Sequence, residues 1–312
     1  MLAFGEVQTG LLQNSTALSR ERALQALSFV TGESVRHSAR PIAHAVSADR
    51  LDSVDCLLPT ASRGHIRGVG TLASHATIVG GQVAQGSTYA TILPSAENRR
   101  MPWSHYLAGH GQIETIGKYR RADLMTGLLR PDPDESTLDT SAITGRMLDT
   151  IQRSASLDRR PPLRAPRTRL RWVASLNDGA TAATAPGEAF TVVTDELRTL
   201  RLTVRGEDLD AVVALCEDLA LHDWLLTTLL SILDTALTSN RSRNQKTERL
   251  RPAVDHLLHL WMPAARIPEE LLPVWEALER HPGFSRQWDA SVARIRDQVT
   301  MSTLALLESP TD

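Results

Sequence analysis

Cysteine, lysine and long apolar runs are all scarce in this 312-residue chain. The two cysteines, Cys56 and Cys216, are too few for a disulfide framework, so the sequence favours a reducing compartment. Only two of the 34 basic residues are lysines, a bias typical of a GC-rich coding genome. The first ten residues lack the basic region of a signal peptide, and no apolar run approaches the roughly 18 residues of a membrane helix. We therefore expect a cytoplasmic protein without a membrane span.

Short motifs that carry chemistry are also absent, and each absence removes a class of site. The chain has no CxxC or HExxH spacing for zinc and no GxSxG elbow for a serine hydrolase. The glycines of Gly64–Gly70 lack the Lys-Ser/Thr ending of a phosphate loop and do not fit GxGxxG before a helix. The sequence therefore assigns no catalytic residue, no metal ligand and no cofactor, and it leaves open whether the protein is an enzyme.

What the chain does have is an uneven distribution of charge. The net charge is only −2, but residues 1–172 hold 21 basic against 15 acidic side chains, and residues 173–312 hold 13 against 21. Two main parts of opposite charge could dock on each other. The predicted divisions are a β-rich domain at 1–158, an Arg/Pro-rich connection at 159–171, a β-hairpin region at 172–204 that packs with either part, and a helical domain at 205–312.

The most regular stretch runs from Glu207 to Leu237. Its apolar residues recur at alternating spacings of three and four, the pattern of an amphipathic helix packed lengthwise against others, so we predict one long central helix. Asp223 interrupts this stripe, either as an exposed bend or as a polar contact that fixes the register, for example with an arginine of another helix. The stripe comprises Leu209, Val212, Cys216, Leu219, Leu226, Leu230, Leu233 and Leu237.

Two segments have the composition of β-hairpins. Thr71–Val79 and Gln82–Leu93 flank Gly80-Gly81, two residues that can take positive φ. Phe190–Thr194 and Leu200–Val204 flank a short acidic turn in the same way. Together with the helical spacing beyond residue 207, these segments predict an α+β fold, with a β-rich N-terminal part containing hairpins and an all-helical C-terminal part around one long helix.

Two polar stretches are interpreted as breaks between elements. Asp49–Asp55 indicates an acidic turn between two short strands. Ser239–Arg251 indicates a solvated joint after the long helix, and Pro252 can occupy the first turn of the helix that follows.

Five residues of the N-terminal part are candidates for a small-molecule site. Imidazole and thiol groups bind ligands and take part in acid–base chemistry, and glycine-bearing loops commonly carry such sites. The hypothesis requires the five side chains to converge in one pocket, since reacting groups must meet at hydrogen-bond range. The candidates are Cys56, His65, Arg67, His105 and His110.

Six arginines between residues 159 and 171 form the strongest basic cluster. Such a cluster could bind phosphates or an acidic partner, but it lacks the interleaved aromatic side chains of a platform for single-stranded nucleic acid. A solvated connection, a dock for the acidic C-terminal part and nucleic-acid binding are the alternatives. The residues are Arg159, Arg160, Arg164, Arg167, Arg169 and Arg171.

Six segments carry a resemblance to a known family: FGEVQTGLLQNS (4–15), RPIAHAV (40–46), DCLLPT (55–60), PWSHYL (102–107), LDRRP (157–161) and TRLRW (168–172). In these segments the chain resembles an uncharacterised actinobacterial protein family. The resemblance implies a cytoplasmic protein encoded beside a variant P-loop protein and a predicted methyltransferase. It transfers no catalytic residue.

The leading hypothesis is a non-enzymatic interaction or scaffold component of an actinobacterial multiprotein system. It is motivated by the absent catalytic motifs, the opposed charge of the two halves and the long predicted helix. Its partners would be proteins, among them the P-loop protein encoded nearby. We expect no association with a membrane. The alternatives are a small-molecule enzyme or ligand-binding protein that uses the five candidates above, and nucleic-acid binding through the arginine cluster.

Overall fold

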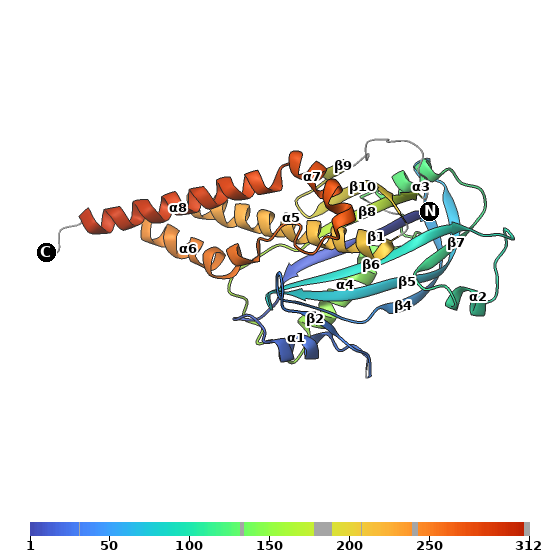
Figure 1. Ribbon diagram of the computed structural model, residues 1–312, viewed down its shortest axis with the longest axis horizontal. Helices are drawn as coiled ribbons and strands as arrows, with labels where there is room; N and C mark the ends of the chain where they lie inside the picture. The colour runs from blue at the N-terminus through green and yellow to red at the C-terminus, as the bar shows by residue number, and fades with distance from the viewer. Residues whose placement is uncertain (31, 132–133, 178–188, 207, 239–242, 309–312) are drawn as a thin grey trace.

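The computed structural model describes residues 1–30, 32–131, 134–177, 189–206, 208–238 and 243–308. A mixed β-sheet dominates the N-terminal two-thirds of this part of the chain, and helices follow from residue 209 (Figure 1). The predicted α+β class, with a β-rich N-terminal part and a helical C-terminal part around one long helix, is confirmed. None of the described helices has both the length and the apolar composition needed to cross a membrane.

The strands form one sheet in the order β2-β3-β5-β7-β6-β1-β8-β10-β9, with β4 paired to β5 beside this path. Most neighbouring strands are antiparallel, but β6 pairs with β7, and β8 with β10, in parallel. The strands are β1 (Leu2–Leu11), β2 (Arg36–Ser38), β3 (His44–Val46), β4 (Arg50–Pro59), β5 (His65–Val79), β6 (Val83–Pro94), β7 (Gln112–Ile116), β8 (Thr168–Asn177), β9 (Ala189–Val192) and β10 (Leu197–Arg205).

The hairpin predicted around Gly80-Gly81 joins β5 to β6, with Val79 opposite Val83. Both glycines take positive φ, +58° and +65°. A Cβ on Gly81 would lie 2.5 Å from the carbonyl oxygen of Leu18, so this turn requires glycine for space as well as for conformation. The second predicted hairpin is confirmed as the antiparallel pair β9 and β10.

Successive side chains along a strand point to opposite faces of the sheet, and both faces of this sheet are buried. On β1, Ala3 and Val7 belong to the cluster beneath the C-terminal helices, whereas Leu2 and Phe4 belong to a cluster on the opposite face. Shorter helices contribute to the clusters on that opposite face or flank the sheet: α1 (Arg20–Leu27), α2 (Trp103–Leu107), α3 (Arg121–Leu128) and α4 (Thr140–Gln152).

The long helix α5 (Leu209–Thr238) lies on the first of these faces and contacts β1, β6 and β8. Val212, Cys216, Leu219 and Leu226 of the predicted stripe are buried in the largest hydrophobic cluster. The stripe reaches the surface at Leu230, which is 39% exposed. The central position predicted for this helix is therefore confirmed.

The polar interruption at Asp223 is buried and paired rather than an exposed bend. Its carboxylate accepts a hydrogen bond from Nε of Arg198 at 3.0 Å, and both side chains are more than nine-tenths buried. The arginine comes from β10, so the contact joins α5 to the sheet and not to another helix. Burial raises the pKa of Asp223, and Arg198 opposes that shift.

The predicted joint at 239–251 is wrong in the part that the structure describes, since residues 239–242 lie outside it. Residues 243–251 belong to α6 (Arg243–His256), and Pro252 lies inside that helix rather than in its first turn. Leu250, Ala253 and Leu257 are buried, and α6 contacts α5 and α8, so packing of a few apolar residues outweighs a polar sequence. The following elements are η1 (Leu258–Leu260), η2 (Glu269–Leu271), α7 (Leu272–Arg280) and α8 (Phe284–Glu308).

The acidic turn predicted at 49–55 is also wrong. β4 begins at Arg50 and pairs with β5 over ten residues, so the backbone hydrogen bonds of the ladder override the turn preference of aspartate. The predicted connection at 159–171 becomes strand β8 from Thr168 onward, because β8 pairs with β1 on one side and β10 on the other. The division into domains stays a prediction.

Candidate functional site

A cavity of about 690 Å³ lies on the α5 face of the sheet, between the strands, the first turns of α5 and the segment before η2. These parts of the chain are distant in sequence, and each supplies charged or aromatic side chains. The residues on which the site is built are Asp49, His75, Tyr89, Asp210, Glu217 and Arg266.

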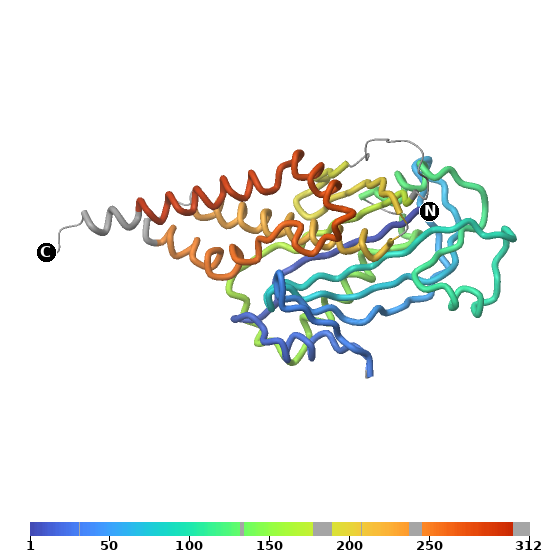
Figure 2. Tube along the Cα trace, viewed as in Figure 1, coloured from blue at the N-terminus to red at the C-terminus, as the bar shows by residue number. Residues whose placement is uncertain are grey.

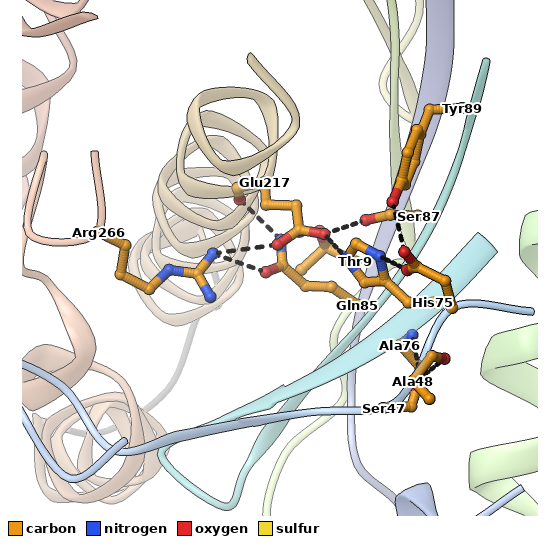
Figure 3. Close-up of polar contacts among 11 residues, drawn as sticks. Thr9, Ser47, Ala48, His75, Ala76, Gln85, Ser87, Tyr89, Glu217 and Arg266 are labelled. Atoms are coloured by element: carbon orange, nitrogen blue, oxygen red, sulfur yellow. Dashed lines mark hydrogen bonds and ion pairs between the residues drawn. The ribbon is translucent and has the colours of Figure 1, made fainter. Parts of the chain in front are cut away.

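Strand register explains how the sheet side of the site is assembled. His75 on β5 lies directly opposite Ser87 on β6. Because the strand period is two, Gln85 and Tyr89 share the face of Ser87, which is the face that α5 covers. Figure 3 shows Glu217 reaching from α5 toward His75 and Ser87.

The segment that carries Arg266 is held against α5 by a backbone contact. Ala264, at a φ of +62°, donates its N–H to Oδ2 of Asp218 at 3.0 Å. Two residues later, Nη2 of Arg266 donates to Oε1 of Gln85 at 3.3 Å. Gln85 in turn donates from Nε2 to the carbonyl oxygen of Glu217 at 2.8 Å, which links the strand, the helix and the segment.

His75 is the centre of the polar network. Its Nδ1–H donates to Oδ1 of Asp49 at 3.0 Å, and its Nε2–H donates to Oε1 of Glu217 at 2.5 Å. Ser87 donates its hydroxyl to the same oxygen of Glu217, and Tyr89 donates its hydroxyl to Oδ2 of Asp49 at 3.2 Å. The rings of His75 and Tyr89 meet edge to face at 5.7 Å. The imidazole is therefore fixed on three sides.

The protonation state of this network follows from its charges. Burial works to lower the pKa of His75, but the charges of Glu217 and Asp49 and their hydrogen bonds to the ring outweigh it and raise the pKa to about 10. Burial works to raise the pKa of Glu217, but the charge and hydrogen bond of His75, the charge of Arg266 and the bond from Ser87 together lower it to about 2. Burial works to raise the pKa of Asp49, but the hydrogen bond and charge of His75, the bond from Tyr89 and the charge of Arg36 together lower it. At neutral pH the site holds an imidazolium between two carboxylates.

This arrangement differs from a catalytic triad in the hydrogen-bond partners of the imidazole Nε2 and of the serine hydroxyl. In a triad, the imidazole Nε2 accepts the proton of the serine hydroxyl. Here Nε2 is occupied by Glu217, and the hydroxyl of Ser87 donates to that carboxylate instead. An imidazolium with a pKa of about 10 has no lone pair to act as a general base near neutral pH. The network therefore provides fixed charges and not an acid–base pair, which is a property of a binding site.

The five residues predicted as a ligand site do not line the α5 cavity, and their convergence in one pocket stays a prediction. All five are described, and no hydrogen bond or ion pair joins any two of the set. Cys56 lies on β4, and burial raises its thiol pKa to about 12, so it is not a nucleophile near neutral pH. Arg67 forms a bidentate pair with Asp55, with both N–O distances at 2.9 Å.

The three histidines of that set lie apart from the α5 cavity. His65 contacts Asp134 at 3.1 Å and lines a shallower hollow of about 920 Å³ near α3. His105, in α2, contacts Glu114 at 2.6 Å. His110 lies in the loop between α2 and β7. No group of three or more His, Cys, Asp or Glu side chains within the described ranges could hold a metal ion.

The arginine cluster is divided by the fold. Arg171 is buried and donates from Nε to Glu6 at 3.1 Å, on the face of the sheet opposite α5. Arg167 pairs with Asp149 at 2.8 Å, and Arg169 donates to Ser141 at 3.3 Å. These three anchor β8 and the chain before it to α4 and β1, while the remaining arginines are exposed: Arg159, Arg160 and Arg164.

Sequence reasoning missed the site because its members lie far apart along the chain. The predicted two-residue turn at Gly80-Gly81 would place His75 opposite Gly86, whereas the observed turn also includes Gln82 and places His75 opposite Ser87. Glu217 is 142 residues from His75, and only the docking of α5 on the sheet brings them together. Arg266 lies in a segment without a sequence signature.

Comparisons with known proteins identify no relative. No protein-family model matches the chain, and no curated protein or solved structure matches it either.

Proposed function

We propose that the protein binds a small polar molecule in the cavity between the sheet and α5. The supporting observation is the network of Asp49, His75 and Glu217 on the wall of a cavity of about 690 Å³, a volume within the usual range of ligand sites. Buried ion pairs are weak sources of stability, because desolvation offsets most of their attraction. Charged groups that are held rigidly beside a cavity instead favour recognition of a polar ligand.

Binding without catalysis fits the chemistry better than an enzyme does. The network keeps one charge state across the neutral range, and none of the described residues that line the cavity is a cysteine. The only cysteine of α5, Cys216, is fully buried with its pKa raised by burial and by Glu217. A preorganised, permanently charged wall lowers the cost of ordering side chains when a ligand arrives.

The test is binding by ligand-observed NMR to a mixture of polar metabolites, with a variant that fills the cavity. Ala214→Phe places a ring in the lining, and the matched control Ala290→Phe adds the same ring on the exposed surface of α8. We expect the wild type and the control to bind the same components and Ala214→Phe to lose them. Binding that survives in Ala214→Phe, or no binding by the wild type, would reject the proposal.

A second candidate is the interaction or scaffold role expected from the sequence. α5, α6 and α8 contact one another and run beyond the end of the sheet (Figure 2). Large apolar side chains are exposed on this arm, including Leu230 (39%), Val254 (43%) and Met301 (51%). Exposed apolar groups on a projecting element favour contact with another protein. The first candidate partner is the variant P-loop protein that the resemblance places nearby in the genome.

This second candidate is tested by light scattering after size exclusion and by co-purification with the P-loop protein. We expect complex formation by the wild type and its loss in Val254→Asp, whereas Val192→Asp on β9, also exposed, should leave it intact. A monomer that never binds that protein would argue against the arm as an interaction surface.

A further inference from the structure

Arg266 lines the cavity with only 8% of its side chain exposed, yet its hydrogen bonding is incomplete. Its bond to Gln85 is long at 3.3 Å, and the nearest carboxylate oxygens, of Glu217 and Asp218, lie at 3.9 and 3.7 Å. Nε has no hydrogen-bond partner among the described residues. Buried donors are ordinarily paired, and a guanidinium matches the oxygens of a carboxylate or phosphate, so this side chain suits an oxyanion of a ligand.

A histidine lies beside Arg266 at the same end of the cavity. His44 of β3 lines the same cavity and interacts electrostatically with Arg266. Burial, and to a smaller extent the charge of Arg266, lower the pKa of His44, while its bond to the carbonyl of Ile42 opposes the shift. His44 therefore adds a polar group without a negative charge beside the guanidinium.

At the Tyr89 end of the cavity (Figure 3) the lining carries the carboxylates of Asp49 and Asp210, and also Arg36, whose charge acts on Asp49. Asp49 has 47% of its side chain exposed, and its two oxygens already hold His75 and Tyr89 in place. Asp210 lines the same cavity, and burial, Asp49 and Asp210, in that order, raise the pKa of Tyr89. Two carboxylates around an aromatic ring suit an ammonium group.

The His75–Glu217 pair lies between these ends and is neutral as a unit. A ligand with one charge would satisfy one end and leave the other end of the cavity desolvated without a partner, which costs affinity. A ligand with both charges would satisfy both ends. We propose that the cavity binds a zwitterionic small molecule, with its carboxylate or phosphate on Arg266 and its ammonium between Asp49 and Asp210. This inference rests on the proposed ligand-binding function.

The test compares zwitterions with probes that carry one of the two charges. The zwitterionic probes are 4-aminobutyrate, 6-aminohexanoate and phosphoethanolamine, and the single-charge probes are butyrate, butylamine and inorganic phosphate. Dissociation constants are measured by ligand-observed NMR. We expect 4-aminobutyrate to bind at least tenfold more tightly than butyrate and butylamine, or phosphoethanolamine to bind at least tenfold more tightly than inorganic phosphate. Preference for phosphoethanolamine identifies phosphate as the anion, and preference for the amino acids identifies carboxylate.

Variants assign each charge to its end of the cavity. Arg266→Gln and Asp210→Asn should each lower the affinity for the zwitterion at least tenfold. Asp210→Asn should leave the affinity for the anionic probe unchanged, whereas Arg266→Gln should lower it. Arg251→Gln is the matched control, because the side chain of Arg251 is 70% exposed on α6, where it pairs with Asp255. It should leave the affinity for every probe unchanged. If Arg266→Gln fails to fold by circular dichroism, Arg266→Lys keeps the charge without the fork and should weaken binding severalfold.

Equal affinity for 4-aminobutyrate and butyrate together with equal affinity for phosphoethanolamine and inorganic phosphate, or no effect of Asp210→Asn, would overturn the inference. Failure of every zwitterion would also overturn it, and the metabolite mixture then separates the two proposals. Binding of another component that Ala214→Phe abolishes leaves the ligand-binding function standing and rejects the zwitterion. Binding of nothing rejects both.

Discussion

Replacement of Glu217 by glutamine removes the negative charge that faces the His75 imidazolium and keeps the size of the side chain. The pKa of Glu217 falls from 4.5 to about 2 in the folded protein, and each pKa unit corresponds to about 1.4 kcal/mol. Its ionised form therefore contributes about 3 kcal/mol to the free energy of unfolding. The raised pKa of His75 reports the same pair, so the two shifts are not added. We expect Glu217→Gln to lower the free energy of unfolding by about 3 kcal/mol at pH 6.

The size of this loss should depend on pH in a defined direction. The contribution of Glu217, whose pKa is depressed on folding, is present above its unfolded pKa of 4.5 and is lost as the pH falls toward 2. The contribution of His75, whose pKa is raised, is fully present below 6.5 and is lost as the pH rises through about 10. The difference between wild type and variant should be largest between pH 4.5 and 6.5 and should shrink toward pH 10.

The assay is urea denaturation at several pH values between 5 and 9.5, followed by circular dichroism. Glu248→Gln, on an exposed residue of α6, is the matched control, and its effect should stay within about 0.5 kcal/mol. A loss of less than about 1 kcal/mol for Glu217→Gln at pH 6, or a loss that is constant from pH 6 to 9.5, would refute the reasoning.

Three further predictions concern other parts of the fold. Gly81→Ala should lower the free energy of unfolding by about 2 kcal/mol or more, because its Cβ would lie 2.5 Å from the carbonyl of Leu18 at a φ of +65°; an unchanged denaturation midpoint would contradict the turn. Asp223→Ala should cost about 3–5 kcal/mol in the same measurement, because Arg198 would stay buried without its carboxylate; a loss under 1 kcal/mol would show that the pair is solvated. Cys56 should resist a thiol reagent at pH 8 until the protein is unfolded, since burial raises its pKa to about 12; rapid labelling of the folded protein would argue against this burial.

Local signals in the sequence were sufficient where one segment determines its own structure. Gly80-Gly81 between two β-rich arms predicted the hairpin of β5 and β6, and the apolar stripe of Val212 to Leu226 predicted a buried helix. Both depend on short-range periodicity and on turn chemistry. They were therefore readable without knowledge of the rest of the fold.

Contacts between distant segments were not readable in this way. α6 forms despite its charged sequence and an internal Pro252, because Leu250 and Ala253 are buried. β10 lies parallel to β8 through a crossover that no local pattern indicates. The candidate site depends on the same kind of information, since Glu217 and His75 meet only after α5 docks on the sheet. The sequence therefore predicted the class of fold, but it did not indicate the cavity between α5 and the sheet.

The most direct measurement of the site is the ¹⁵N chemical shift of the His75 imidazole across a pH titration. The account predicts that both ring nitrogens carry protons and that neither shift changes between pH 5 and 8.5, because Asp49 and Glu217 hold the pKa at about 10. Titration of His75 near pH 6.5, or the shift pattern of a neutral imidazole at pH 7, would contradict the charged network and the binding site that is built on it.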